Sequence, residues 1–156
     1  MIIGIPKEIK NEEYRVGLTP FSAHELVAHG HTVVVEKDAG LGIGFSDADY
    51  EAAGVTVMPS AEAVYSEAEM IVKVKEPQPS EYGLIKKDQI LFTYLHLAAD
   101  LPQTQALMDS GCVAIAYETV TDHRDSLPLL TPMSQVAGRL SVQVGSQCLF
   151  KYNGGS

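Results

Sequence analysis

The sequence predicts an α/β fold: a doubly wound, largely parallel sheet with flanking helices and a long C-terminal helix. Short apolar runs rich in β-branched residues alternate along the chain with helix-like segments. Neighbouring parallel strands need a crossover between them, and helices in that role cover both faces of the sheet. The 156 residues, 46% of them hydrophobic, suffice for one globular domain of this kind.

The apolar runs are expected to form the strands of the sheet. Each run is short and bounded by residues typical of turns, which favours a strand over a buried helix. The expected strands are Met1–Ile5, Thr32–Val35, Val55–Met58, Met70–Val74, Ile90–Leu95 and Val113–Ala116.

Start and stop signals mark the helices between these runs. Thr19 is the expected N-cap of the first helix, with Pro20 at its first position and Gly30 after its end. Ser46 and Asp49 have the spacing of a capping box, in which each side chain bonds the backbone of the other residue. Further helices are expected to begin at Ser60 and near Pro102, the latter closed by Gly111.

The last segment, residues 131–152, is expected to form one long helix. Thr131 and Pro132 provide an N-cap and a first-turn proline. Apolar residues then recur every fourth position and form one stripe, which favours packing against another helix and leaves a subunit contact open. The stripe consists of Val136, Leu140, Val144 and Cys148. We therefore divide the chain into an α/β domain, residues 1–130, and a helix and turn, residues 131–156.

The chain ends in Asn153-Gly154-Gly155-Ser156, a turn sequence that ordinarily connects two elements. We therefore expect a truncated chain that stops short of a further domain.

The charge and the termini bound the class of protein. The net charge of −9, from 20 acidic and 11 basic residues, argues against nucleic acid and anionic membranes, because both attract clustered Lys and Arg. No apolar run approaches the ~20 residues of a membrane helix. The N-terminus lacks the small-residue cleavage site of a secretory leader. We expect a cytoplasmic protein.

Metal and cofactor motifs are not found in the sequence. Cys112 and Cys148 are not near a second cysteine at metal-ligand spacing, and we expect both to be buried and reduced. The stretch Gly40–Phe45 resembles a phosphate-binding turn, but its third glycine comes one residue too early for G-x-G-x-x-G. We interpret it as a loop leading into the helix that Ser46 caps.

Polar residues are expected beyond the carboxyl ends of the strands, where open parallel sheets bind ligands. Arg15 follows the first strand and has the fork geometry to hold a small carboxylate. His96 follows an uncharged strand, and an imidazole titrates near neutral pH, as proton transfer requires. Position alone favours simpler interpretations, in which Arg15 is a solvated surface arginine and His96 is a hydrogen-bonded core histidine. The other histidines, His24, His29, His31 and His123, are expected to be solvated.

Lys75 ends a strand and is followed by Glu76-Pro77, which must leave the sheet because proline cannot donate to the ladder. A lysine there is a point charge suited to polarising a carbonyl or holding a carboxylate, or it simply reaches water. Lys73 shares the same strand face, so spacing does not choose between the two. Glu118, at the end of another strand, either orients a lysine or histidine or solvates the strand end.

The combination of motifs resembles the alanine dehydrogenases and the related proton-translocating transhydrogenases. The opening motif is Ile5-Pro6-Lys7-Glu8 leading to Tyr14–Pro20, and the others are Lys73–Pro77, Phe92–Ala98, Ala114–Val120 and Pro128–Ser134. Because the transhydrogenases lack the histidine that stands at position 96 of the motif Phe92–Ala98, the resemblance favours alanine dehydrogenase. One departure is Phe150, where the family usually carries a glutamate.

The resemblance implies roles for the candidate residues. Arg15 and Lys75 would be the ligands of the substrate's carboxylate and carbonyl oxygens, and His96 the acid/base. Met133 and Ser134 would meet the nicotinamide end of NAD. The implied reaction is the reversible oxidative deamination of L-alanine to pyruvate and ammonia, with hydride passing to NAD.

The resemblance also implies a larger assembly. NAD would be bound mainly by a domain absent from this chain, the full-length protein would be a homo-oligomer, a hexamer in the family, and this chain alone would be inactive. Two alternatives stay open: a non-catalytic interaction module assembled through the long helix, and a transhydrogenase-like or saccharopine dehydrogenase-like subunit whose cofactor domain lies on another chain.

Overall fold

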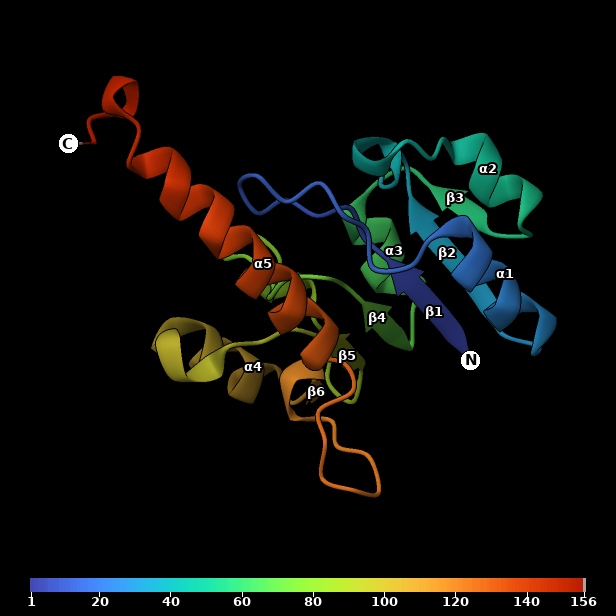
Figure 1. The fold of residues 1–156 in the computed structure, drawn as a ribbon. Coiled ribbons are helices and arrows are strands. Elements are labelled where there is room, and N and C mark those ends of the chain that lie inside the picture. The colour runs from blue at the N-terminus through green and yellow to red at the C-terminus, as the bar shows by residue number, and fades with distance from the viewer. Residues whose placement is uncertain (156) are drawn as a thin grey trace. The chain divides into compact units, whose positions relative to one another are not determined.

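A computed structural model describes residues 1–155, which form two compact units. Unit 1 is Met1–Ala116 and unit 2 begins at Tyr117. Unit 1 is a six-stranded sheet with helices beside it (Figure 1). Its strand order is β3-β2-β1-β4-β5-β6, and all neighbouring strands run parallel. The doubly wound α/β fold expected from the sequence is confirmed.

Every expected strand is present in the sheet. The strands are β1 (Ile2–Ile5), β2 (Thr32–Glu36), β3 (Thr56–Met58), β4 (Met70–Val72), β5 (Ile90–Thr93) and β6 (Val113–Ala116). The helices of unit 1 are α1 (Pro20–Ala28), α2 (Asp47–Ala52), α3 (Ala61–Glu67) and α4 (Leu101–Ser110).

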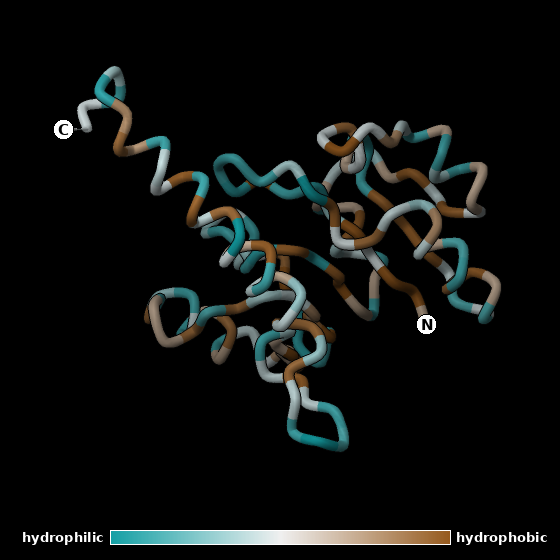
Figure 2. The backbone as a smooth tube through the Cα atoms, viewed as in Figure 1, coloured by the Kyte–Doolittle hydropathy of each residue, from teal (hydrophilic) through white to brown (hydrophobic). Residues whose placement is uncertain are grey.

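Both faces of the sheet are buried along its central strands, as a doubly wound sheet requires, whereas the edge strand β6 is largely exposed. Along β2 the side chains alternate: Val33 and Val35 belong to one core and Val34 to the other. The first core also contains Ala23 of α1 and Tyr50 of α2. The second contains residues of α3 and α4, among them Val64, Tyr65 and Leu107. Figure 2 shows the first strands mainly in brown, whereas the loop after β1 is teal and therefore polar.

The helix signals are confirmed with one shift. The Thr19 side chain accepts from Ser22 N at the start of α1, and Ser46 and Asp49 form the expected capping box. Ser60 caps α3. The N-cap of α4 is Asp100, just before Leu101 and Pro102, because its carboxylate accepts from Gln103 N. Gly111 closes α4 with a left-handed φ of 68°.

Two strands end earlier than expected. β4 ends at Val72 rather than Val74, because Val74 N donates to the Glu8 carboxylate instead of continuing the ladder to β1. β5 ends at Thr93 rather than Leu95, and His96 then turns the chain into a short 3-10 turn, Leu97–Ala99.

Unit 2 contains the long helix α5 (Thr131–Cys148), preceded by the 3-10 turn Tyr117–Thr119 and followed by another, Lys151–Asn153. The expected end at Tyr152 is wrong, because the backbone becomes extended at Phe150. The expected cap is wrong as well: Leu130 is the N-cap, and the Thr131 hydroxyl donates to Leu127 O from inside the helix.

Two further expectations concern membrane-spanning helices and the two cysteines. Within residues 1–155, none of the helices combines the length and apolar character of a membrane span. The expectation of buried cysteines is wrong, since Cys112 is half-buried and Cys148 is exposed; both are free thiols.

Candidate functional site

The structure places three predicted site residues at one edge of the sheet. Arg15 lies in the loop after β1, Lys75 follows β4, and His96 follows β5. These strands are neighbours, in the order β1-β4-β5, and all run parallel. Their carboxyl ends therefore meet at the edge where open parallel sheets bind ligands.

Arg15 is held by Glu13 in a bidentate pair. Arg15 Nε donates to Glu13 Oε1 at 2.8 Å and Nη2 donates to Oε2 at 2.6 Å, while the Arg15 backbone N donates to Oε1 at 2.9 Å. The Glu13 side chain is 7% exposed and the Arg15 side chain 42%. Glu13 is therefore the buried support, and Arg15 the partner that reaches the surface.

The ionisation of both groups reflects this pair. The hydrogen bond to Glu13 raises the pKa of Arg15 above its ordinary value. The same bond from Arg15 lowers the pKa of Glu13, and the positive charge of Lys75 lowers it further.

Tyr94 lies beside His96. Its proximity contributes to the raised pKa of Arg15. The ring of Tyr94 stacks against that of His96, with centroids 6.0 Å apart and planes inclined by 7°. Glu13 therefore contacts Arg15, and Tyr94 contacts His96; neither Glu13 nor Tyr94 was a candidate from the sequence.

His96 adopts a left-handed backbone conformation, with φ 51° and ψ 39°. Such a conformation is uncommon outside glycine and persists where the surroundings impose it. Here Gln103, fully buried in α4, donates from Nε2 to the Leu95 carbonyl at 2.8 Å and fixes the residue before the turn. His96 is exposed, so the core-histidine reading is wrong. His24, His29 and His123 are exposed as expected, and His31 is half-buried.

The two lysines of β4 and its extension have different environments. The Lys73 side chain is 0% exposed; its Nζ lies 2.7 Å from Glu81 Oε1 and 3.5 Å from Glu8 Oε2. Tyr65 donates its hydroxyl to the same Glu81 oxygen at 3.1 Å, and burial raises the pKa of that hydroxyl strongly. Lys75 is only half-buried. Lys73 is therefore a buried structural cation, whereas Lys75 is partly open to solvent.

A cavity of about 230 Å³ borders the Arg15–Glu13 pair. Its walls also include Lys7 and Glu8 from the loop after β1 and Asp38 from the loop after β2. The volume exceeds that of several water molecules, each of which occupies ~30 Å³.

The glycine-rich stretch serves packing. A Cβ on Gly42 would overlap the carbonyl oxygen of Tyr14, and one on Gly40 would lie 2.8 Å from the Tyr50 ring. The stretch contains the 3-10 turn Leu41–Ile43 and leads into α2. This agrees with the loop interpretation.

The remaining candidates belong to unit 2. Met133 and Ser134 lie in the first turn of α5, both exposed, and Glu118 lies in the turn before it. A thioether and a hydroxyl carry no charge that would bind a phosphate.

Removing the Arg15 guanidinium should release the Glu13 carboxylate from its low pKa. We expect the pKa of Glu13 in wild type below the ordinary glutamate value, and clearly higher in Arg15→Ala, where burial acts without the hydrogen bond. The stabilisation from the pair is present above the unfolded pKa and is lost as pH falls through the lowered folded pKa. Carboxyl carbon shifts measured by NMR against pH test this, with Arg124→Ala as the control; an unchanged Glu13 pKa in Arg15→Ala contradicts it.

Comparison with known proteins identifies related chains. The sequence profile "Alanine dehydrogenase/PNT, N-terminal domain" matches residues 4–137. The curated alanine dehydrogenase of Staphylococcus haemolyticus is 60% identical over 155 residues, covering 99% of this chain and 41% of the relative. That of Bacillus subtilis is 56% identical, covering 99% and 40%.

Solved structures show the same relation. A structure of an L-alanine dehydrogenase superposes with a TM-score of 0.91 at 59% identity, covering 99% of this chain and 43% of that one. The transhydrogenase from Sinorhizobium meliloti has a TM-score of 0.71 at 30% identity, covering 76% and 34%. The chain thus spans about two-fifths of the length of the curated relatives, 41% and 40%. Since the family profile matches most of its residues, the chain belongs to the alanine dehydrogenase/PNT N-terminal domain family.

Proposed function

We propose that this chain is the substrate-binding portion of an NAD-dependent alanine dehydrogenase, which catalyses the reversible oxidative deamination of L-alanine to pyruvate and ammonia. The observation that carries the proposal is the juxtaposition of Arg15, Lys75 and His96 at the carboxyl ends of three neighbouring strands. The relatives named alanine dehydrogenase support it, at 60% and 56% identity.

Arg15 and Lys75 are the proposed ligands of the substrate. The Arg15 guanidinium has five N–H donors, of which Glu13 engages one on Nε and one on Nη2. A guanidinium so oriented suits a planar carboxylate. The ammonium of Lys75 is a compact charge that stabilises negative charge developing on the carbonyl oxygen of the substrate.

His96 is the proposed acid/base. The reaction passes through an imine, to which water adds before ammonia leaves, and each step moves a proton. An exposed imidazole at the strand end takes and returns those protons. NAD, when bound, accepts the hydride from the substrate carbon.

The wider organisation is also proposed. Residues 1–130 form the substrate-binding domain, and residues 131–156 form a helix and turn leading toward an NAD-binding domain outside this chain. Met133 and Ser134 then meet the nicotinamide, while NAD binding rests mainly on that other domain. The whole protein is a cytoplasmic homo-oligomer, for which the exposed apolar stripe of α5 offers a contact surface.

Titration of the chain with pyruvate, followed by amide NMR, tests the proposal. Wild type is expected to show dispersed peaks that shift on titration. In Arg15→Ala the affinity should fall at least about tenfold, because the chain loses charged hydrogen bonds worth ~1.5–3 kcal/mol each. Arg124→Ala, which removes an exposed arginine of unit 2, is the control and should bind as wild type does.

The contrary outcome has a specific meaning. A dispersed spectrum that does not respond to pyruvate would contradict the proposal and favour the interaction module, whose support is the exposed stripe of Val136, Leu140 and Val144 on α5. Sedimentation of the same sample then shows whether the chain self-associates.

A further inference from the structure

The backbone that carries Lys75 lies beyond the regular sheet. The ladder between β1 and β4 pairs Ile3 with Met70 and Gly4 with Ile71, and then stops. Lys75 comes four residues after Ile71, beyond the part of β4 that pairs with β1 through backbone hydrogen bonds. Backbone N–H groups that are partly buried there need other acceptors.

Glu8 supplies the acceptor. Its Oε1 receives hydrogen bonds from Val74 N at 2.6 Å and from Lys75 N at 3.3 Å. The two partners lie 66 and 67 residues away in sequence, so these bonds connect the loop after β1 directly to the extension of β4. One carboxylate oxygen thus replaces the interrupted ladder at the position of the substrate-binding lysine.

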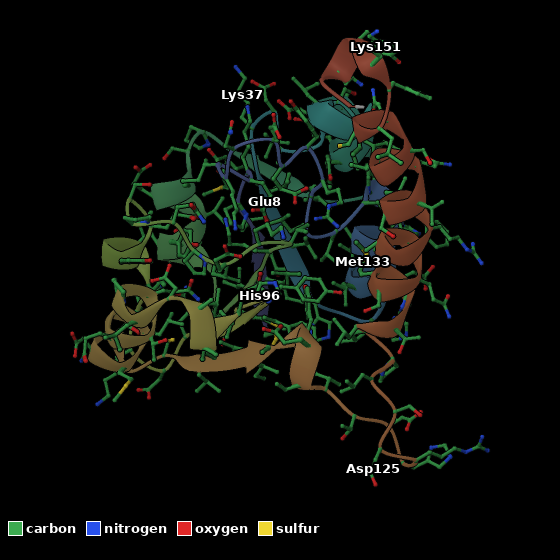
Figure 3. All side chains as sticks on the ribbon, turned by 60° about the vertical axis from the view of Figure 1, so that its left-hand side comes forward. Glu8, Lys37, His96, Asp125, Met133 and Lys151 are labelled. Atoms are coloured by element: carbon green, nitrogen blue, oxygen red, sulfur yellow. The ribbon has the colours of Figure 1, made fainter. Side chains whose placement is uncertain are left out.

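Glu8 is itself fixed in place. Its side chain is 2% exposed, and its second oxygen, Oε2, faces Lys73 Nζ at 3.5 Å. Glu8 is one of the side chains labelled in Figure 3. Burial raises the pKa of this carboxyl, against the opposing effects of Lys73 and of the two backbone donors. A group held from two sides in this way has little freedom to move the backbone that it binds.

The opposite side of the segment is held by β5. Thr93 Oγ1 donates to the Lys75 carbonyl oxygen at 2.9 Å, and Lys73 N donates to Phe92 O at 3.1 Å. The N–H of Lys75 is therefore bonded toward β1 and its carbonyl toward β5. Between these anchors, the direction in which the Lys75 side chain leaves the backbone is determined.

We propose that Glu8 is a positioning residue for Lys75: its carboxylate clamps the Val74–Lys75 backbone and so directs the ammonium of Lys75 to the substrate. The proposal rests on the proposed function, in which Lys75 binds the substrate. Glu8 contacts the backbone of Lys75, so the effect proposed here is exerted through Lys75.

A double-mutant cycle separates positioning from a general structural role. Pyruvate affinity of the full 156-residue chain is measured by NMR for wild type, Glu8→Ala, Lys75→Ala and the double variant. We expect Glu8→Ala to weaken binding about tenfold in wild type and less than about twofold in the Lys75→Ala background, because a misdirected side chain matters only while it is present. A general structural role gives equal losses in both backgrounds and would overturn the proposal.

Glu36 provides the matched control. Its Oε2 also accepts a backbone hydrogen bond across neighbouring strand ends, from Lys7 N at 2.7 Å, and burial likewise raises its pKa. It does not bond the Lys75 segment. Glu36→Ala should therefore leave the pyruvate affinity within about twofold of wild type; a tenfold loss there would show that any lost carboxylate clamp disturbs the site and would overturn the specific role of Glu8.

The amide signal of Val74 gives a readout that needs no ligand. Its short bond to a carboxylate should place the amide proton far downfield in wild type, less so in Glu8→Gln, where a neutral amide oxygen replaces the carboxylate. Glu8→Gln keeps the size of the side chain, so it replaces Glu8→Ala as the test variant if Glu8→Ala does not fold. Its pyruvate affinity should lie between those of wild type and Glu8→Ala. An unchanged Val74 shift contradicts the clamp. If Lys75→Ala alone leaves pyruvate binding unchanged, the proposed function of Lys75 fails instead.

Discussion

Replacing Lys73 by Met is expected to lower the free energy of unfolding by about 3–5 kcal/mol, because it leaves buried carboxylates without their cation. Glu8 and Glu81 both face Lys73 Nζ, and their side chains are 2% and 3% exposed. Methionine has nearly the length of lysine, so packing changes little and the lost charge dominates. Against a typical total of ~5–15 kcal/mol, this is a large loss.

Urea unfolding followed by far-ultraviolet circular dichroism measures this effect, since the chain has no tryptophan. Lys86→Met is the control: its ammonium also makes one hydrogen bond, to Ser66 O at 2.7 Å, but in an exposed position. Its removal should cost less than about 1 kcal/mol. Adding Glu81→Gln to Lys73→Met should restore part of the loss, because it removes one of the unpaired charges. Equal midpoints for Lys73→Met and Lys86→Met would show that the buried cluster contributes no more than a surface contact.

The fold was accessible from the sequence because each strand of a doubly wound sheet is short, apolar and bounded by turn residues. Residue patterns do not show where side chains take over from the backbone ladder. β4 therefore ends two residues early, at the point where Glu8, 66 residues away, accepts the N–H of Val74. The end of α5 could not be predicted for a local reason. The apolar stripe stops at Cys148, but the residues that follow carry no clear helix stop signal before the backbone becomes extended at Phe150.

The site was partly accessible for a related reason. Parallel strands bring their carboxyl ends together, so Arg15 and His96 could be placed at one edge without knowing their distance. The strand pattern could not show which of Lys73 and Lys75 is the candidate ligand, since both occupy the same face of the strand and differ only in how deeply their side chains are buried. Glu81, which determines that depth by pairing with Lys73, lies outside the strand pattern. Glu13 was the one missed residue with a local signal, an acidic side chain two positions before Arg15.

Replacing Gly17 by Ala is expected to destabilise the fold and weaken the site together. A Cβ on Gly17 would overlap the carbonyl oxygen of Val72 and lie 2.9 Å from its carbonyl carbon and 3.2 Å from Lys73 Cα. These are backbone atoms at the end of β4, so they cannot rotate away as a flexible side chain does. Relief requires the two segments to separate, at a cost of about 3 kcal/mol, the upper end for overpacking.

The same separation would also displace the proposed substrate ligands. Gly17 follows Arg15 by two positions, and Lys73 precedes Lys75 by two, so moving the two backbones apart pulls the two proposed substrate ligands apart as well. Small displacements of positioned groups are costly in sites that hold a small ligand on several sides. Gly17→Ala should therefore bind pyruvate at least about tenfold more weakly than wild type even under conditions where it remains folded.

Gly83→Ala is the matched control, because a Cβ at Gly83 meets nothing within 4 Å. Its free energy of unfolding should stay within about 0.5 kcal/mol of wild type. Urea unfolding and the pyruvate titration, run on both variants, decide the matter. If Gly17→Ala loses stability but keeps wild-type affinity, the two loops adjust independently, and the contact between Gly17 and Val72 supports the fold without setting the distance between Arg15 and Lys75. If it loses both, the close approach of these backbones is what holds the two cations at the spacing that a carboxylate and its neighbouring carbonyl require.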